Sequence, residues 1–456
     1  MECGGQGWAA VPQAGVAKYG DMTGGRVALA REQRQTASPT REEAGSRPAS
    51  LARPAPGRHA FADLAIEPIQ RAVGFEFETG WNVWDRTNIE VWSRSGKQGK
   101  PPSPRVLAKK DMVYQGDDFK VEADEAAESL AELEFIVHPP IEANEEGRKR
   151  LFASMTHMTV LGAKLIAAAS RAHTSGLPLS LDMATSAQSD KKFLLRAIDN
   201  VLAAGPQVTT GITLGKIGKL GQKQGPQERE LPASFSATVK QVASTSEVAT
   251  KAMTQLPEDL QPGSSELHGL LTLIISYLWG GEQAVFYPKQ IADVVALART
   301  DFAKLFKLLP QNEQTYFKKT PRAFVGLALD AAGLADEPDA PVIGKVWTDE
   351  NRSEKKAVGP TRAEWLFFMT QGYDKLSSVH YKEFASSYQG DPTKQHLGSD
   401  LESLGEFGEK TEQVGSQHQE AGIFELRNAA TKAKIPLLQW APFAGQVMDY
   451  LIALEG

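Results

Sequence analysis

Acidic side chains alternate with phenylalanines in the segment FEFET at residues 75–79. Strict alternation predicts a β-strand, in which successive side chains point to opposite faces. Glu76 and Glu78 would then share one face, while Phe75 and Phe77 pack on the other. Carboxylate oxygens are the ligands that Mg²⁺ prefers, so the pair is a candidate for metal binding, with an ordinary solvated strand face as the alternative.

Three further segments repeat this pattern. A single charged strand face usually meets only water, but glutamate is depleted in strands, and four such faces favour a cation-binding site. Carboxylates together with an arginine could hold Mg²⁺, or Mn²⁺ as the alternative ion, and a nucleotide triphosphate. The segments are DFKVEAD at 118–124, with Glu122 and Asp124 on one face, ELEFIV at 132–137, with Glu132 and Glu134, and IFELRN at 423–428, with Glu425 and Arg427.

The order of these motifs resembles the amidoligase family, the ATP-dependent carboxylate-amine ligases of the glutamine synthetase and glutamate-cysteine ligase fold. The resemblance rests on GFEFE at 74–78, DFKVEADE at 118–125, LEFIVHPP at 133–140 and IFELRN at 423–428. The family's helical stretch is similar to residues 269–306, so the matches extend over most of residues 70–430.

The resemblance implies roles for individual residues. Lys289 and Arg299 would contact phosphate or substrate, with a solvated helix face as the alternative for both. The implied metal ligands are Glu76, Glu78, Asp124, Glu134 and Glu425; the implied catalytic residues are Asp124, Glu134 and Arg427; and Glu76, Glu78 and Arg427 would also bind the nucleotide.

One segment departs from the family pattern. Many relatives have His-x-His on a central strand, where this chain has PQVTTGI, with Gln207 and Thr209 on one face. Glutamine and threonine can hydrogen-bond a ribose, a phosphate or water, so we expect both residues in the cofactor site. They replace imidazole poorly as metal ligands.

The expected activity is formation of an amide bond between a carboxylate and an amine through an acyl phosphate, using ATP and Mg²⁺. The substrates would be small molecules, peptides or proteins. A two-metal phosphodiesterase or nuclease is one alternative, because carboxylate clusters also serve phosphoryl displacement. A catalytically altered pseudo-ligase that acts as a binding or exported effector protein is another. Serine and cysteine acyl transfer lack a candidate, since no GxSxG motif occurs and Cys3 is the single cysteine.

The elements that would position these residues alternate along the chain. Strands are predicted at 75–79, 118–124, 132–137, 206–214 and 423–428. Helices are predicted at 147–173, 189–204, 236–255, 264–279, 288–309 and 361–370, with a last helix ending near Leu454. This order predicts an α+β fold, whose antiparallel sheet of the glutamine synthetase or glutamate-cysteine ligase type joins remote segments and carries helices.

Composition limits the other readings. The 456 residues include 50 basic and 56 acidic ones, and the net charge of −6 does not favour nucleic-acid binding. The longest uncharged apolar run, 269–281, is too short to span a bilayer, so no membrane is expected.

The ends and insertions complete the prediction. Residues 1–62 are rich in Arg, Pro and Ala and are predicted to be disordered. One domain would cover 63–456, with loop insertions near 215–235 and 335–360. The expected location is cytoplasmic, with export by a signal-peptide-independent route through the N-terminal segment as the alternative.

Overall fold

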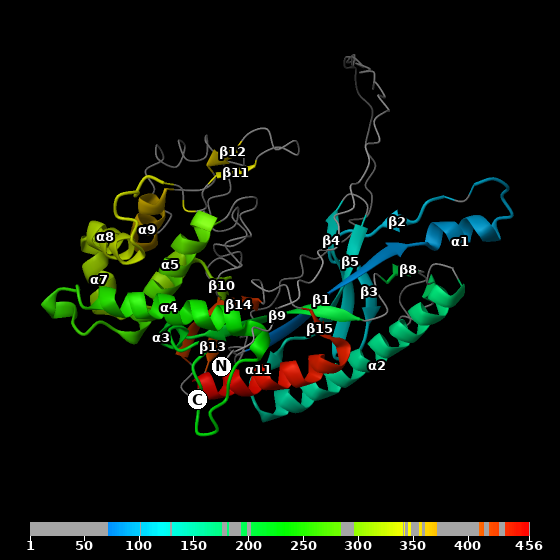
Figure 1. Cartoon of the computed structure of the whole chain (residues 1–456), viewed down its shortest axis with the longest axis horizontal. Coiled ribbons are helices and arrows are strands. Elements are labelled where there is room, and N and C mark those ends of the chain that lie inside the picture. The colour runs from blue at the N-terminus through cyan, green and yellow to red at the C-terminus, as the bar shows by residue number, and fades with distance from the viewer. Residues whose placement is uncertain are drawn as a thin grey trace, which may run out of the picture. The chain divides into compact units, whose positions relative to one another are not determined.

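The computed structural model describes the strands and helices of one compact unit, Ala65–Gly456 (Figure 1). The prediction of disorder for residues 1–62 lies outside the described part of the chain. The described residues are 72–100, 102–127, 130–175, 180–181, 193–197, 202–283, 296–340, 342, 345–347, 355–357, 361–371, 410–414, 419–427 and 434–455.

An open antiparallel sheet forms the centre of the unit and joins segments that are remote in sequence. Its main path has the order β10-β14-β9-β1-β5-β4-β3. The strands β2, β6, β8, β13 and β15 pair with members of this path, and β7 pairs with β8. The path strands are β10 Ala296–Ala298, β14 Gln419–Arg427, β9 Ala203–Ile212, β1 Ala72–Asp85, β5 Leu130–Val137, β4 Phe119–Ala127 and β3 Met112–Gln115. The others are β2 Arg105–Val106, β6 Ile141–Glu142, β7 Ser180–Leu181, β8 Phe193–Arg196, β13 Thr411–Val414 and β15 Ile435–Pro436.

Together with its helices, this sheet gives the α+β class that the sequence predicts. The predicted strands at 75–79, 118–124, 132–137, 206–214 and 423–428 correspond to β1, β4, β5, β9 and β14. Apart from the sheet, β11 Lys345–Trp347 and β12 Lys355–Ala357 form an antiparallel pair within the predicted insertion at 335–360.

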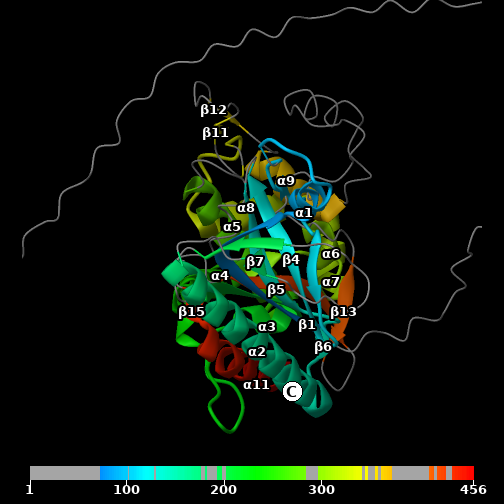
Figure 2. The same ribbon diagram turned by 90° about the vertical axis from the view of Figure 1, so that its right-hand side faces the viewer.

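Two long helices, α2 Glu145–Ser175 and α11 Trp440–Glu455, lie side by side over one face of the sheet (Figure 2). The alternation in β1 explains this layer, because Phe77 is fully buried and its ring stacks on Trp440 with centroids 4.6 Å apart. Phe135 of β5 meets the same indole edge-on at 5.3 Å. Since side chains alternate along each strand, the carboxylates of β1 and β5 point to the opposite face.

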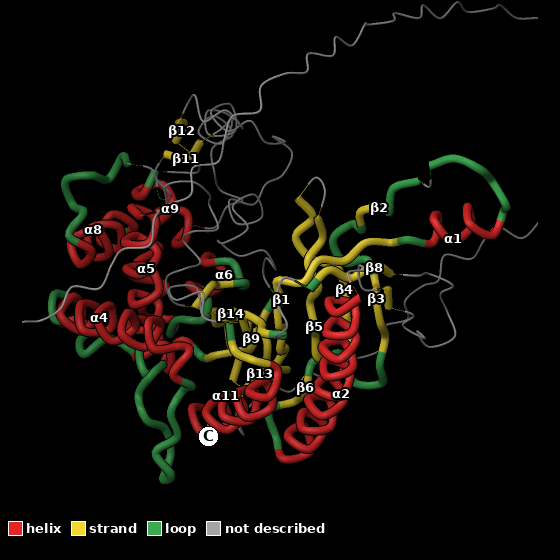
Figure 3. The backbone as a smooth tube through the Cα atoms, turned by 45° about the vertical axis from the view of Figure 1, so that its right-hand side comes forward, coloured by secondary structure: helices red, strands yellow, loops and turns green. Residues whose placement is uncertain are grey.

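A second group of helices lies beside the β14 end of the sheet (Figure 3). The apolar run at 269–281 forms most of α5, where Leu270, Leu273 and Ile274 are fully buried. Tyr277 of α5 accepts a hydrogen bond at its hydroxyl from the backbone N–H of Ala298, 2.7 Å away, and so ties this group to the sheet. The helices are α3 Leu214–Ile217, α4 Ser236–Met253, α5 Ser265–Gln283, α6 Phe302–Phe306, α7 Gln311–Lys319, α8 Pro321–Ala332 and α9 Arg362–Gln371.

The remaining described helices are short. They are α1 Thr87–Arg94 and the 3₁₀ turns η1 Ala233–Phe235, η2 Glu258–Leu260 and η5 Leu437–Gln439. The predicted loop at 215–235 begins within α3 and ends at η1, and is otherwise built of turns.

Two helix predictions are wrong in the described residues. Within the predicted helix 189–204, Phe193–Arg196 is strand β8, which pairs with Asn82–Asp85 of β1. Within the predicted helix 288–309, Ala296–Ala298 is strand β10 on β14, and only Phe302–Phe306 is helical. In both places pairing with a distant strand overrides the local helical pattern. Helices α7 and α8 lie in a region where the sequence analysis predicts no regular element.

One segment of α2, Glu145–Ser170, is long and apolar enough by length and composition to cross a membrane, and 33% of it is buried in the fold. The core helix of a soluble protein passes the same test. Met155 and Met158 of this segment are buried against the rest of the unit. The absence of a membrane remains a sequence-based expectation.

Candidate functional site

Five adjacent strands bring charged and polar side chains together on the sheet face opposite α2 and α11. The pairing places Glu78 opposite Glu134 of β5, and Glu134 opposite Glu122 of β4. On the other side of β1, Glu76 lies opposite Gln207 of β9, which lies opposite Arg427 of β14. Because directly opposed residues share a face, the four acidic segments of the sequence meet on one surface.

Three of the predicted metal ligands form a compact group. Glu78, Asp124 and Glu134 each offer a carboxylate oxygen, and these oxygens lie within 4.8 Å of one another. Glu134 is 6% exposed, whereas Glu78 is only partly buried, so the group has a buried base and an accessible side. Carboxylate oxygens at this spacing could hold a metal ion.

Burial and mutual repulsion raise the pKa values of two carboxyl groups here. Burial is the largest cause for Glu134, followed by the charge of Glu76 and its other acidic neighbours, and raises the pKa to about 9. Burial and then the charge of Glu425 raise the pKa of Glu76 to about 7, although Arg427 and Arg299 oppose the shift. Like charges this close are costly without a cation, so a divalent ion would stabilise the ionised group.

The opposite end of the face is cationic. Glu425, 2% exposed, accepts from the Nε of Arg427, and its other oxygen lies 3.4 Å from the Nε of Arg299. Glu425 is not one of the three clustered carboxylates and pairs with two guanidinium groups, so its role as a metal ligand stays a prediction. Arg299 follows strand β10 and reaches the face from there, although the sequence places it on a helix.

The two polar residues of β9 lie between the acidic and cationic ends. The side-chain amide of Gln207 donates to a carboxylate oxygen of Glu78, and Thr209 lies opposite Glu425. Gly205, opposite Glu78, leaves open space: a Cβ at this position would meet no described atom within 4 Å. A ligand could therefore approach the backbone directly beside Glu78.

Two lysines at the acidic end were not predicted. The ammonium nitrogen of Lys120 lies 2.5 Å from a carboxylate oxygen of Glu122. The ammonium nitrogen of Lys109 lies 2.8 Å from a carboxylate oxygen of Asp124. Lys120 is two residues before Glu122, so the alternation places both side chains on the same strand face. Lys120 could therefore have been predicted from the sequence. Lys109 lies in a turn, and only the tertiary structure brings it to the site.

Two further residues of the predicted site are Glu76 and Lys289. Glu76 lies between the acidic group and the arginines but is not one of the three clustered carboxylates. Lys289 lies outside the described residues.

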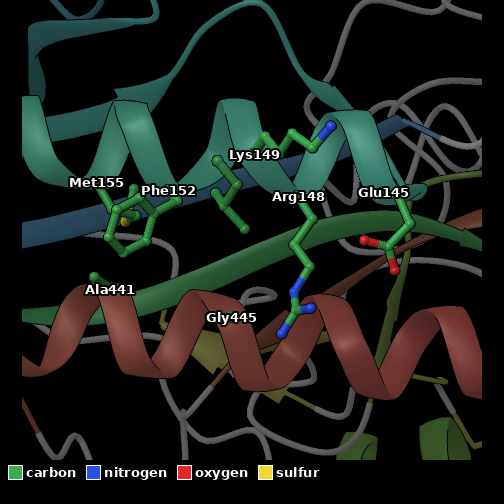
Figure 4. A pocket seen from close by; sticks show the side chains of 8 residues that line it. Glu145, Arg148, Lys149, Phe152, Met155, Ala441 and Gly445 are labelled. Carbon is green, nitrogen blue, oxygen red and sulfur yellow. The ribbon is translucent and has the colours of Figure 1, made fainter.

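A pocket of about 410 Å³ lies elsewhere, between α2 and α11 (Figure 4). Phe152, Met155 and Ala441 form its apolar part, while Arg148 and Lys149 line its charged end. Since α2 and α11 cover the aromatic face of the sheet, this pocket is on the far side from the carboxylates and belongs to a different surface.

Comparison with known proteins gives no relative: no family model, curated protein or solved structure matches the chain.

Proposed function

We propose that the protein is an ATP- and Mg²⁺-dependent ligase that joins a carboxylate to an amine. The observation that carries the proposal is the meeting of carboxylates and arginines, from strands remote in sequence, on one face of an antiparallel sheet. The order of the sequence motifs adds the resemblance to amidoligases, and with it a sheet of the glutamine synthetase or glutamate-cysteine ligase type.

The proposed reaction has two displacements. An oxygen of the substrate carboxylate attacks the γ-phosphorus of ATP, the bond to the β–γ bridging oxygen breaks, and ADP leaves. The amine nitrogen then attacks the carbonyl carbon of the acyl phosphate, and inorganic phosphate leaves with the former carboxylate oxygen. The proton lost by the amine passes to solvent. No nucleophilic side chain is required, and the described face offers carboxylates, amides and cations.

Glu78, Asp124 and Glu134 would hold the divalent ion. Such an ion, when bound, neutralises phosphate oxygens and orients the γ-phosphate for attack. The three carboxylates come from neighbouring strands whose backbone pairing fixes their spacing. Gln207 supports this arrangement, because its amide holds one oxygen of Glu78.

Arg299 and Arg427 would bind the anionic groups of the substrates. Glu425 orients both guanidinium groups, and the side chain of Arg427 is 30% exposed, so it can also meet a ligand. Guanidinium groups bind carboxylate and phosphate in a fixed geometry. The metal ion of the nucleotide would then bind at the acidic end of the face, and an anionic group would bind at the arginine end. Thr209 lies between these two ends. The carboxylate and amine can belong to small molecules, peptides or proteins.

The test is nucleotide-dependent amide formation. The purified chain is incubated with ATP, Mg²⁺ and mixtures of amino acids and peptides, and ADP and amide products are measured. We expect ADP release to require both an acid and an amine, and Glu78→Gln with Glu134→Gln to lower it at least about 100-fold. Glu146→Gln is the matched control, because Glu146 is 73% exposed on α2, away from the face.

Other outcomes would identify a different function. Full turnover by the double variant would show that this face is not the site. Cleavage of a phosphodiester without ATP would favour the two-metal hydrolase. Binding of ATP and Mg²⁺ without any product would favour the pseudo-ligase.

A further inference from the structure

Lys109 is held over the acidic group by a turn that is hydrogen-bonded to β4. The N–H of Lys110 donates to the carbonyl of Ala123 at 2.7 Å, and the N–H of Ala123 donates to the carbonyl of Asp111 at 3.0 Å. Asp111 also accepts from the N–H of Ala108 through its side chain, 3.0 Å away. The backbone of the turn is therefore fixed to the strand that carries Asp124, and Lys109 stands beside that carboxylate.

The ion pair itself is asymmetric. The Asp124 side chain is 13% exposed, whereas that of Lys109 is 52% exposed, although the two charged atoms lie 2.8 Å apart. Ion pairs with one solvated partner contribute little free energy and exchange easily. The neighbouring pair of Lys120 and Glu122 is more enclosed, with side chains 21% and 6% exposed. Of these two ion pairs, the one between Lys109 and Asp124 is thus the more open to solvent.

A divalent ion and the Lys109 ammonium would compete for Asp124. Asp124 supplies one of the three clustered oxygens, so an ion bound there would lie within a few ångströms of the ammonium. Two cations at such a distance repel each other. A nucleotide that arrives with the ion brings several negative charges to the same edge. A lysine side chain has a flexible four-carbon stem, so the ammonium can turn from Asp124 to a phosphate oxygen without a change in the backbone.

We propose that Lys109 is a positioning residue that exchanges partners: it neutralises Asp124 in the empty site and moves to a phosphate of the bound nucleotide when a divalent ion takes Asp124. This inference rests on the proposed function. It adds a residue that the sequence motifs do not contain, and it assigns the nucleotide phosphates to the β4 side of the face. It also gives the turn at 107–111 a purpose, since this turn fixes the starting point of the exchange.

The experiment measures metal affinity and turnover separately in the full chain. Free Mn²⁺ is titrated by electron paramagnetic resonance without nucleotide, and the KM for ATP is measured by ADP release. We expect Lys109→Met to bind Mn²⁺ about threefold to fivefold more tightly, because the internal competitor is gone. The same variant should raise the KM for ATP about tenfold with a smaller change in kcat. Lys109→Arg should behave as the wild type in both measurements.

Lys110→Asn is the matched control, because it removes the same charge from the adjacent residue. The backbone of Lys110 has φ of 70°, a conformation that asparagine tolerates. Equal Mn²⁺ affinity in Lys109→Met and wild type, or an equal gain in Lys110→Asn, would overturn the inference and leave the proposed function intact. An unchanged KM for ATP in Lys109→Met would also overturn it. If the wild type bound no Mn²⁺, the inference and the proposed function would both fail.

Discussion

The ionisation of Glu134 couples the charge of the site to the stability of the fold. It is buried among other carboxylates, and its pKa is raised from 4.5 to about 9. Between pH 4.5 and about 9, the Glu134 carboxyl is therefore protonated in the folded chain without a metal ion and ionised in the unfolded chain. It follows that the free energy of unfolding falls as the pH rises through this range.

Replacing Glu134 by glutamine should remove the contribution of this residue to the pH dependence, while Glu76, with its pKa raised to about 7, keeps its own. We expect the Tm of the wild type in EDTA to fall by at least about 3 °C more than that of Glu134→Gln between pH 5.5 and 8.5. Thermal unfolding followed by circular dichroism measures both slopes. Glu146→Gln should keep the wild-type slope, and equal slopes for wild type and Glu134→Gln would contradict the raised pKa.

Gln207 donates its side-chain amide to the carboxylate of Glu78, so it would affect a bound metal ion through Glu78 and not as a ligand itself. Gln207→Leu removes the amide that donates to Glu78. Groups that orient a ligand typically contribute about tenfold or more to metal affinity, so Mn²⁺ should bind about tenfold more weakly. Gln207→His keeps an N–H donor and should retain most of the affinity. A Mn²⁺ titration in which Gln207→Leu equals the wild type would exclude this role.

At the scale of elements, the alternation of apolar and acidic residues was sufficient to predict the central strands and their faces. Phe75 and Phe77 are fully buried, and Glu76 and Glu78 lie on the opposite face, as the spacing predicts. The short strands β8 and β10 could not be predicted in this way, because each is a few residues long and gains its hydrogen bonds from a distant partner. The prediction that Arg299 lies on a helix was wrong for the same reason, because Arg299 directly follows β10.

The aromatic contact between β1 and α11 should be a large contribution to stability. Phe77→Ala removes a fully buried ring that stacks on Trp440 at 4.6 Å and meets Phe443 at 6.3 Å. We expect a loss of about 3–5 kcal/mol in the free energy of unfolding, measured by urea denaturation. Phe152→Ala is the control: its side chain is 71% exposed on α2, and its loss should cost less than about 0.5 kcal/mol. Equal losses would contradict the assignment of the core.

At the scale of the whole molecule, the sequence predicted the α+β class and the approach of remote carboxylates, but not the division of the charged face. Which acids cluster and which pair with arginines depends on register. Glu78 and Glu134 are directly opposed, whereas Glu425 is one strand beyond β9 and beside Arg299. A shift of two residues in one strand would leave every face unchanged and still rearrange these partners.

The compact unit Ala65–Gly456 contains all the described residues of the face. A chain that lacks residues 1–64 should therefore unfold cooperatively, with a Tm within about 2 °C of the full chain. Its Mn²⁺ affinity should also be unchanged. Differential scanning calorimetry and the same Mn²⁺ titration check both values. A clear loss of either would mean that the first 64 residues contribute to the fold or to the site.

The early position of the central strand β1 in the sequence affects how the sheet can assemble during translation. Its neighbour β9 begins about 120 residues after β1 ends, and β14, which pairs with β9, begins about 330 residues after it. Helix α11, which covers Phe77, follows later still. During translation the ribosome therefore releases β1, β4 and β5 well before the strand and helix that complete their surroundings. The nascent sheet would carry an uncovered aromatic surface and an unpaired edge for much of its synthesis. We expect such a chain to depend on chaperones that bind apolar segments, and its charged face to be complete only after Glu425 and Arg427 of β14 have emerged.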